Sequence, residues 1–522
     1  MTKNNSIFYT AYVALIVSLG GFLMGFDASV ISGVIKFIEP EFNLSKIELG
    51  WAVASLSLTA TFSMMIAGPL SDKYGRRTIL KIAAVLFSIS AVASAFAPSF
   101  LVLVIARMLG GLGVGAALII APMYIAEIAP AKYRGRMVSL NQLNIVLGIT
   151  VAFFTNYMIL NLSDSQAGWA QSLHFDLWNW RWMLGLETLP AVLYFGCLFL
   201  VPESPRWLLM KNRDDEALSI MAKTKSVEEA QKDIALIKAS MSSSTTDSKV
   251  PISHLFKPAM RLVMIIGVSV AILQQITGIN AVFFYAPMIF EQSGLGTDAS
   301  FMQAIYVGLI NVCFTILAIM LIDKIGRKVL LVAGVAGSAV CMFSLSYGFN
   351  SATYTLTAES IQALPNTIDK SALVLLQDQT FNDDLSFKAS IESLLGSEAL
   401  VQHESTFVSS AIKMNQTLIL VSLLGFVACF AVSLGPVMWV LFSELFPNSI
   451  RGVAISFVGL INSGVSFTVQ LVFPWQLANI GTTITFALYG VFAMIGLAVI
   501  LRYLPETKGK SLEELEAILI KK

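Results

Sequence analysis

Residues 72–77 read DKYGRR and residues 323–328 read DKIGRK, so one short charged motif occurs twice in the chain. Each copy joins two long apolar segments. Two further pairs of motifs recur in the same order, namely Glu127 to Arg134 with Glu444 to Arg451, and PESPR at 202–206 with PETKG at 505–509. The common order of these repeats predicts that the chain folds as two pseudo-symmetric halves.

The apolar segments between the motifs indicate an integral membrane protein. Of 522 residues, 56% are hydrophobic and 13% are charged, against about 25% charged residues in ordinary globular domains. Segments of about twenty apolar residues are long enough to cross a bilayer as helices. The first is too long for a cleavable signal peptide, so we expect it to remain as a span. We predict an all-α fold of twelve transmembrane helices, near 8–32, 46–71, 78–97, 100–126, 137–160, 181–201, 259–291, 301–322, 329–348, 414–443, 450–474 and 481–503.

The short loops between these spans divide by charge. Basic loops, at 72–77, 132–136, 324–328 and Arg451, alternate with loops almost free of lysine and arginine. The positive-inside rule places the basic loops and both termini in the cytoplasm. Parallel six-helix halves with a site between them are typical of alternating-access carriers. The predicted domains are an N-terminal half at 1–202, a cytoplasmic helical linker at 203–258, and a C-terminal half at 259–522 that ends in a short cytoplasmic tail.

An acidic, lysine-poor segment at 349–412 interrupts the second half on the outer side. Two interpretations remain open for it. It is either a small cap over the outer mouth or an insertion that the fold tolerates.

Residues 274–285, QQITGINAVFFY, place three carboxamides and a glycine in the middle of an apolar segment. Amides at hydrocarbon depth cost free energy unless a partner satisfies them. Neighbouring helices could supply that partner. A polyhydroxylated ligand could do so as well, because an amide offers both donors and acceptors to a sugar hydroxyl. We favour the ligand, and we expect Gly278 to loosen the helix where the ligand approaches.

A lone carboxylate lies deep in the first apolar segment, at Asp27. It should be protonated or paired with a cation, and Arg107, in the segment 100–126, is the available partner. Glu187 is a second acid within a predicted span. A permanent structural ion pair between Asp27 and Arg107 is the alternative to a proton-binding site.

Together, these motifs resemble the sugar porter family of the major facilitator superfamily. The resemblance covers the chain outside 349–412, and it is stronger to bacterial proton-coupled xylose and hexose symporters than to facilitative glucose transporters. Ile319 stands where the first loop motif has Gly68, and Ser463 stands where animal facilitators carry tryptophan. The signatures are GPLSDKYGRR at 68–77, Glu127 with RGR at 134–136, PESPRW at 202–207, QQITGIN at 274–280, Glu444 with RG at 451–452, and PETKG at 505–509.

The resemblance implies a sugar site lined by amides and one tryptophan, whose indole offers a flat apolar face to the sugar ring. Gly435 and Pro436 are expected to break the helix ahead of that tryptophan. Hydrogen bonding between helices is the structural alternative for the amides, and a membrane-interface position is the alternative for the tryptophan. The site residues are Gln142, Gln274, Gln275, Asn280, Asn311, Trp439 and Asn462.

Charged residues at the cytoplasmic ends of the helices are implied to form an inner gate network. Such a network biases a two-state equilibrium because it closes in only one conformation. Charge that merely sets the topology is the alternative. The gate residues are Asp72, Arg76, Glu127, Arg134, Asp323, Arg327, Glu444 and Arg451.

The resemblance further implies proton coupling, with Asp27 as the protonation site, Arg107 as the partner that modulates its protonation, and Glu187 as an accessory acid. We therefore expect a secondary active transporter that imports a monosaccharide such as xylose, glucose or galactose by proton symport. A proton-independent facilitative uniporter is the main alternative. A sugar receptor without transport activity and a drug or metabolite antiporter are the others.

Several other classes find no support in the sequence. No phosphate-binding loop, metal cluster or nucleophile–base pair indicates an enzyme or a cofactor. A net charge of +1 gives no reason to expect nucleic-acid binding. The expected partners are the sugar, protons and the lipid bilayer of the cell membrane, with the monomer as the functional unit. The four cysteines lie in apolar segments and predict neither disulfides nor a metal site; they are Cys197, Cys313, Cys341 and Cys429.

Overall fold

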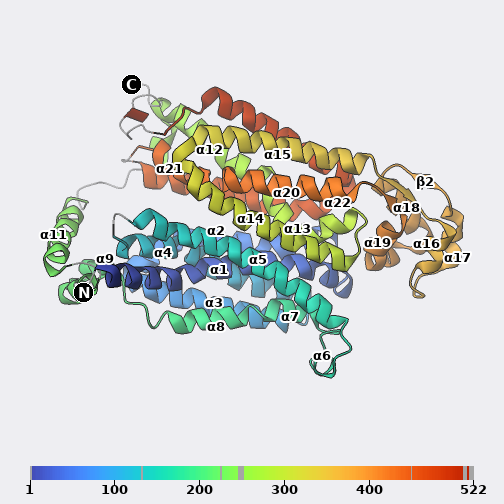
Figure 1. Ribbon diagram of the computed structural model, residues 1–522, viewed down its shortest axis with the longest axis horizontal. Helices are drawn as coiled ribbons and strands as arrows, with labels where there is room; N and C mark the ends of the chain where they lie inside the picture. Colours follow the sequence, from blue (N-terminus) through green and yellow to red (C-terminus); the bar gives the residue numbers. More distant parts are fainter. Residues whose placement is uncertain are drawn as a thin grey trace.

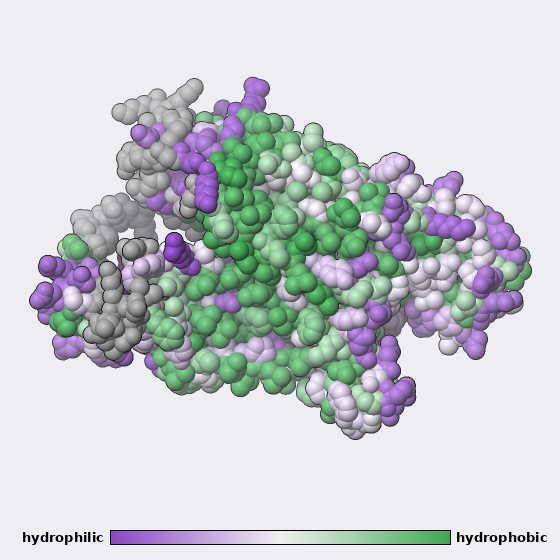
Figure 2. Space-filling model, viewed as in Figure 1, coloured by the Kyte–Doolittle hydropathy of each residue, from purple (hydrophilic) through white to green (hydrophobic). Residues whose placement is uncertain are grey.

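The computed structural model describes residues 3–130, 133–223, 226–244, 252–447, 450–508 and 514–515. Long helices run along the length of the molecule, as Figure 1 shows. Within the described ranges, ten helices are long and apolar enough to cross a membrane. Figure 2 shows apolar side chains over the middle of the molecule and polar side chains gathered at its two ends. This distribution suits a body whose middle lies in a hydrocarbon layer.

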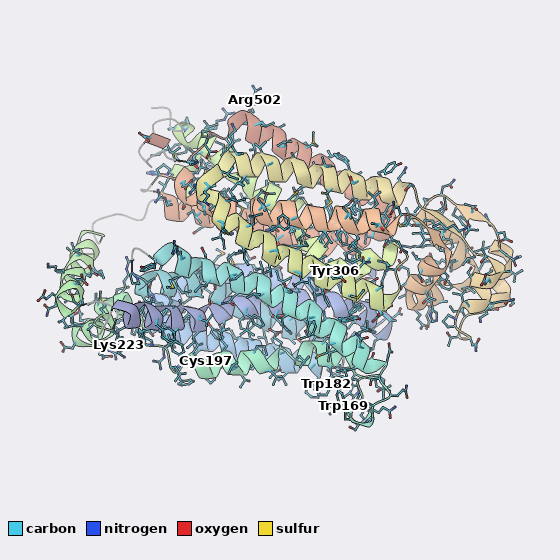
Figure 3. All side chains as sticks on the ribbon, in the orientation of Figure 1. Trp169, Trp182, Cys197, Lys223, Tyr306 and Arg502 are labelled. Atoms are coloured by element: carbon cyan, nitrogen blue, oxygen red, sulfur yellow. The ribbon has the colours of Figure 1, made fainter. Side chains whose placement is uncertain are left out.

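The two ends of the molecule differ. One end, here called the terminal end, holds the start of α1 and the short helices of the predicted linker (Figure 1). The opposite end, here called the insertion end, holds residues 353–413. Figure 3 places Trp169 and Trp182 near the insertion end and Lys223 at the terminal end. The linker contains α9 (Pro205–Met210), α10 (Asp214–Met221), α11 (Val227–Ser244) and the 3-10 turns η1 (Ile252–Phe256) and η2 (Pro258–Met260).

The N-terminal bundle consists of the helices that precede α9. Ser45 and Glu48 form a capping box that starts α2. The predicted span at 181–201 is two short helices instead of one, because Pro190 has no N–H to donate to the carbonyl of Leu186. The helices are α1 (Lys3–Glu41), α2 (Lys46–Tyr74), α3 (Arg76–Ala95), α4 (Phe100–Ile128), α5 (Arg134–Ser163), α6 (Gly168–Ser172), α7 (Asn179–Gly185) and α8 (Thr188–Cys197).

Breaks interrupt the long helices of the C-terminal bundle. Gly278, with φ 91°, separates α12 from α13, and Gly481, with φ 80°, bends α22. Ser433 separates α20 from α21, slightly ahead of the break predicted at Gly435 and Pro436. The helices are α12 (Arg261–Ile276), α13 (Ile279–Gln292), α14 (Thr297–Ile325), α15 (Arg327–Asn350), α20 (Gln416–Val432), α21 (Leu434–Leu445) and α22 (Arg451–Tyr503).

These helices account for the twelve predicted spans. Helices α7 and α8 together make the sixth span, α12 with α13 the seventh, and α20 with α21 the tenth. Helix α22 supplies the last two spans, which meet at Gly481. The helical fold predicted from the sequence is confirmed, although α1 runs on to Glu41 where its span was predicted to end near residue 32.

The two bundles meet along three helix pairs. Helix α2 packs on α22, α5 on α14, and α1 on α13. The ring of Trp51 on α2 lies edge-on to that of Phe467 on α22, with centroids 5.5 Å apart. Trp51 is near the start of α2, so this contact lies toward the insertion end.

Residues 353–413 are folded, which the sequence did not predict. A three-stranded antiparallel sheet in the order β2-β1-β3 holds the segment together. A separate apolar cluster, with Phe387 and Phe407 fully buried, forms its core. The elements are β1 (Thr353–Thr355), α16 (Ala358–Ala363), α17 (Lys370–Leu373), η3 (Val374–Leu376), β2 (Thr380–Phe381), α18 (Asp384–Leu395), α19 (Ser397–Ala411) and β3 (Ile412–Lys413).

Candidate functional site

A cavity of about 270 Å³ lies between the two bundles. Its volume is near the lower end of the roughly 300–1,000 Å³ of typical ligand pockets, which suits a small ligand. Helices α1, α2, α4 and α5 contribute to one wall, and α12–α14 and α20–α22 to the other. All seven side chains predicted for the sugar site line this cavity: Gln142, Gln274, Gln275, Asn280, Asn311, Trp439 and Asn462.

The amides of the C-terminal bundle are joined to each other. Gln275 Nε2 donates to Asn462 Oδ1 at 3.1 Å, and Asn280 Nδ2 donates to Gln275 Oε1 at 2.8 Å. Asn462 Nδ2 donates to Gln274 Oε1 at 2.9 Å, and Gln274 Nε2 donates to the carbonyl of Leu434 at 3.0 Å. Part of the hydrogen-bonding capacity is thus used between helices, and the amides still face the cavity.

The break at Gly278 brings these amides together. It ends α12 just after the two glutamines and restarts the chain as α13 just before Asn280. Glycine adopts a left-handed backbone without the steric cost that a Cβ brings. A Cβ at this position would also lie 2.6 Å from the ring of Tyr489. The helix was expected to loosen here, and the structure has a turn at Gly278 between two helices.

Three further residues extend the network, and the sequence prediction missed them. Asn280 Nδ2 also donates to Ser466 Oγ at 2.6 Å, and Gln470 Nε2 donates to the same oxygen at 2.8 Å. Ser57 Oγ, from the N-terminal bundle, donates to Gln470 Oε1 at 2.8 Å. The signal was present in the sequence, because Asn462, Ser466 and Gln470 recur every fourth residue and share one helix face.

Trp439 and the remaining two predicted residues lie apart from this network. The indole of Trp439 is 43% exposed and lies edge-on to the ring of Phe442 at 5.9 Å. Gln142 on α5 and Asn311 on α14 face the cavity from different bundles. A ligand in the cavity would therefore touch both bundles and one broad aromatic face.

The three predicted proton-coupling residues come together behind the cavity wall. Arg107 Nη1 donates to Asp27 Oδ1 at 3.3 Å, and Arg107 Nε donates to the carbonyl of Ala52 at 2.9 Å. Glu187 interacts electrostatically with both Asp27 and Arg107. All three side chains are almost fully buried, and none is among the described residues that line the cavity.

Two carboxyl oxygens of this group have no hydrogen-bond partner in the described part of the chain: Asp27 Oδ2 and Glu187 Oε1. A buried, ionised carboxyl group with an unpaired oxygen costs free energy, and protonation lowers that cost. One arginine also faces two carboxyl groups here. The arrangement can therefore hold a proton on one of the two acids while Arg107 balances the charge of the other.

At the terminal end, the predicted gate residues form one cluster in each bundle. Arg76 pairs with Glu127 at 3.1 Å and with Asp72 at 2.7 Å. Arg327 pairs with Glu444 at 3.0 Å. The linker and the tail motif complete the clusters, because Ser204 donates to Glu127 and Thr507 Oγ1 donates to Glu444 Oε2 at 2.6 Å. These two clusters repeat the internal symmetry of the sequence.

Arg451 differs from Arg76 and Arg327 in its described partner. Arg451 Nε donates to the carbonyl of Phe446 at 3.0 Å. The side chains of Arg134 and Asp323 lie outside the described part of the structure. The motif glutamates Glu203 and Glu506 were not predicted as gate residues. Each accepts a backbone N–H from the start of a helix, that of Arg77 at 3.1 Å and that of Arg327 at 3.0 Å.

Comparisons with known proteins give one consistent family. The model of the family described as "Sugar (and other) transporter" matches residues 13–367 and 395–519. The chain is 33% identical to the arabinose-proton symporter of Bacillus subtilis, covering 100% of this chain and 97% of that protein. It is 35% identical to the D-xylose-proton symporter of Escherichia coli, covering 99% and 97%. The segment outside the family model, 368–394, is shorter than the predicted 349–412.

Solved structures agree with this result. The inward-open conformation of the xylose transporter XylE from E. coli aligns with a TM-score of 0.73 at 33% identity, and covers 97% of this chain and 99% of that one. Its partially occluded inward-open conformation gives a TM-score of 0.72 at 32% identity. The chain therefore belongs to the sugar transporter family of the major facilitator superfamily, the family predicted from its motifs.

Proposed function

We propose that this protein imports a monosaccharide, a pentose or a hexose such as xylose, glucose or galactose, together with a proton. The observation that carries the proposal is the cavity between the bundles, in which seven polar and aromatic side chains face one small volume. The relatives named as proton symporters of arabinose and xylose support both the ligand class and the coupling. Membership of a transporter family makes the chain a multi-pass membrane transporter and not an enzyme.

The chemistry of the cavity supports a sugar. Amides can donate to one hydroxyl and accept from another, so a ring of hydroxyl groups can replace the bonds that Gln275 and Asn280 now make to each other. The exposed face of Trp439 offers an apolar surface to the C–H groups of a sugar ring. A lipophilic cation offers no hydroxyl groups to these amides, which argues against a drug antiporter.

The buried trio supports proton coupling. Asp27 and Glu187 share the positive charge of Arg107, so gain or loss of one proton changes the net charge of a fully buried group. A change of this kind can bias the equilibrium between two conformations. A facilitative uniporter, with a permanent pair of Asp27 and Arg107, remains the alternative.

The two bundles are proposed to be the moving halves, 1–202 and 259–522, with 203–258 as a cytoplasmic linker and both termini in the cytoplasm. Contacts between the bundles at Trp51, Ser57 and Lys36 lie toward the insertion end. At the terminal end, each described gate cluster lies within one bundle. We therefore assign this structure to the inward-facing state, with the monomer in the cell membrane as the functional unit.

Exchange in proteoliposomes tests the ligand class. Vesicles are loaded in turn with unlabelled xylose, arabinose, glucose or galactose, and entry of the same labelled sugar is followed without a proton gradient. We expect one or more of these sugars to exchange, and Gln275→Ala to reduce the exchange at low sugar concentration. If none of these sugars exchanges, and the protein instead transports a lipophilic cation, the result would favour an antiporter.

A further inference from the structure

Residues 353–413 form a folded unit that transport of the sugar does not explain. The unit has its own sheet and its own apolar core, in which the ring of Tyr354 stacks on that of Phe387 at 5.3 Å. The family model leaves out residues 368–394 within it. A tolerated loop would need no fixed contact with the helices, so the contacts that the unit makes are informative.

One residue of the unit, Glu404 on α19, joins several elements. Its carboxylate pairs with Lys46 at the start of α2, at 3.0 Å, and with Lys388 on α18, at 2.8 Å. It also accepts a hydrogen bond from Gln292 Nε2, at the end of α13, at 2.9 Å. Lys46 belongs to the N-terminal bundle and Gln292 to the C-terminal bundle. Glu404 is therefore held by both bundles at once.

The next residue continues this bridge. Lys36 on α1 donates to Ser405 Oγ at 3.3 Å and pairs with Glu291 on α13 at 2.6 Å. Lys36 also donates to Thr297, the first residue of α14. Two adjacent residues of α19 thus lie on a seam at which α1 and α2 meet α13 and α14. Separation of the bundles at the insertion end would pull at least one partner away from each.

The charges at this seam are balanced by these contacts. The side chain of Glu404 is only 17% exposed. Burial alone would raise its pKa, but attraction to Lys388 and Lys46 outweighs burial and holds the pKa well below its usual value. Lys46 also pairs with Glu39 at 2.6 Å. A charge-assisted hydrogen bond is roughly twice as strong as a neutral one, so the loss of Glu404 would weaken the closed seam in particular.

We propose that residues 353–413 act as a clasp, with Glu404 and Ser405 at its contact, that stabilises the state in which the bundles are closed at the insertion end. This role rests on the proposed alternating access and goes beyond it. The clasp makes one side of the transporter harder to open than the other. Of the two interpretations of this segment, the proposal replaces the tolerated insertion with a segment that stabilises one conformation of the transporter.

Distances between the bundles test the clasp without reference to any sugar. Asn161→Cys on α5 and Asp298→Cys on α14, both exposed near the insertion end, carry spin labels in the full chain, with Cys197, Cys313, Cys341 and Cys429 replaced by serine or alanine. Pulsed electron–electron double resonance then gives the proportions of molecules with open and with closed distances between the two labels. We expect Glu404→Gln to raise the open-to-closed ratio at least about 5-fold.

Two variants keep the result interpretable. Glu398→Gln removes a carboxylate from the same helix, where the side chain is exposed, and should leave the ratio unchanged. The exchange of charges in Lys46→Glu with Glu404→Lys should restore part of the closed population that either change alone removes. An unchanged ratio in Glu404→Gln, or an equal shift in Glu398→Gln, would overturn the clasp. Failure of the wild type to move any sugar would overturn the proposed function and leave the distance measurement intact.

Discussion

The hydrogen bond from Ser57 to Gln470 is the point at which the cavity network crosses from one bundle to the other. Gln470 is almost fully buried, and its amide joins Ser57 on one side to Ser466 on the other. Replacing Ser57 with alanine leaves Gln470 Oε1 without this donor in the present state. When the bundles separate at the insertion end, water can reach the same oxygen. The cost of the change therefore falls mainly on the closed state.

The size of the effect follows from that difference. A buried acceptor left unsatisfied costs about 1–3 kcal/mol, and a differential free energy of this size shifts a two-state equilibrium about 5- to 150-fold. We expect Ser57→Ala to shift the bundles by this amount toward opening at the insertion end. The spin-label pair at 161 and 298 measures the shift directly.

A matched control lies one turn along the same helix. Thr61 also lines the cavity, but its hydroxyl donates to the carbonyl of Ser57, within α2, at 2.8 Å. Thr61→Val should therefore leave the distances between the bundles unchanged. Ser57→Thr keeps a hydroxyl at this position and should also preserve the wild-type distances. If Ser57→Ala leaves the populations as they are, or if Thr61→Val shifts them equally, the network does not link the cavity to the movement of the bundles.

Four further predictions follow from the same contacts. Asp27→Asn should abolish accumulation of sugar against a gradient and spare sugar exchange; accumulation that survives the change in proteoliposomes would remove Asp27 as the proton site. Gln275→Ala should weaken sugar binding about 2- to 13-fold for each lost hydrogen bond, which titration calorimetry measures; equal affinity would place the sugar elsewhere. Gly278→Ala should lower the thermal unfolding midpoint, because strain at a positive φ costs about 1–3 kcal/mol and the added Cβ meets the ring of Tyr489, whereas Gly68→Ala, with no atom within 4 Å of its Cβ, should not. The depressed pKa of Glu404 means that its contribution is present above about pH 4.5, its usual pKa, and is lost only as pH falls further, so Glu404→Gln should lower the closed fraction by the same factor at about pH 7 and at about pH 5; a factor that shrinks between these two pH values would contradict the depressed pKa.

The duplicated charged motif predicted the fold because it recurs, with the other motifs, in the same order in both halves of the chain. Loops that repeat in the same order between apolar segments leave little choice of architecture for the bilayer. The breaks within the helices were harder to locate. Gly278 was anticipated, since glycine beside amides is a local signal, and Gly435 with Pro436 predicted the second break, which the structure places slightly earlier, at Ser433.

The candidate site divides in the same way. The resemblance to sugar porters implied that Trp439 and the amides line one site, and the structure gathers them around one cavity. Ser57 escaped notice because a single serine in a helix is common, and only the position of Gln470 in the other bundle makes it a link. The contacts of Glu404 with Lys46 and Gln292 were likewise invisible, because these residues lie 358 and 112 positions away in the chain.

The fold of residues 353–413 shows a different limit. The sequence predicted an acidic, lysine-poor segment on the outer side, and Figure 2 shows many polar side chains at this end of the molecule. The short strands have only two or three residues each, too few for an alternating pattern to be read. The core formed by these elements follows from tertiary packing, which the sequence pattern does not contain.

The central claim is that movement of a sugar is coupled to movement of a proton. Uptake of labelled xylose, glucose and galactose into proteoliposomes, with and without an inward proton gradient, tests it most directly. We predict that at least one sugar accumulates above its external concentration only when the gradient is present, and that Asp27→Asn abolishes this accumulation. Uptake that stops at equal concentrations regardless of the gradient would contradict the account and would leave a uniporter, with Asp27 and Arg107 as a structural pair.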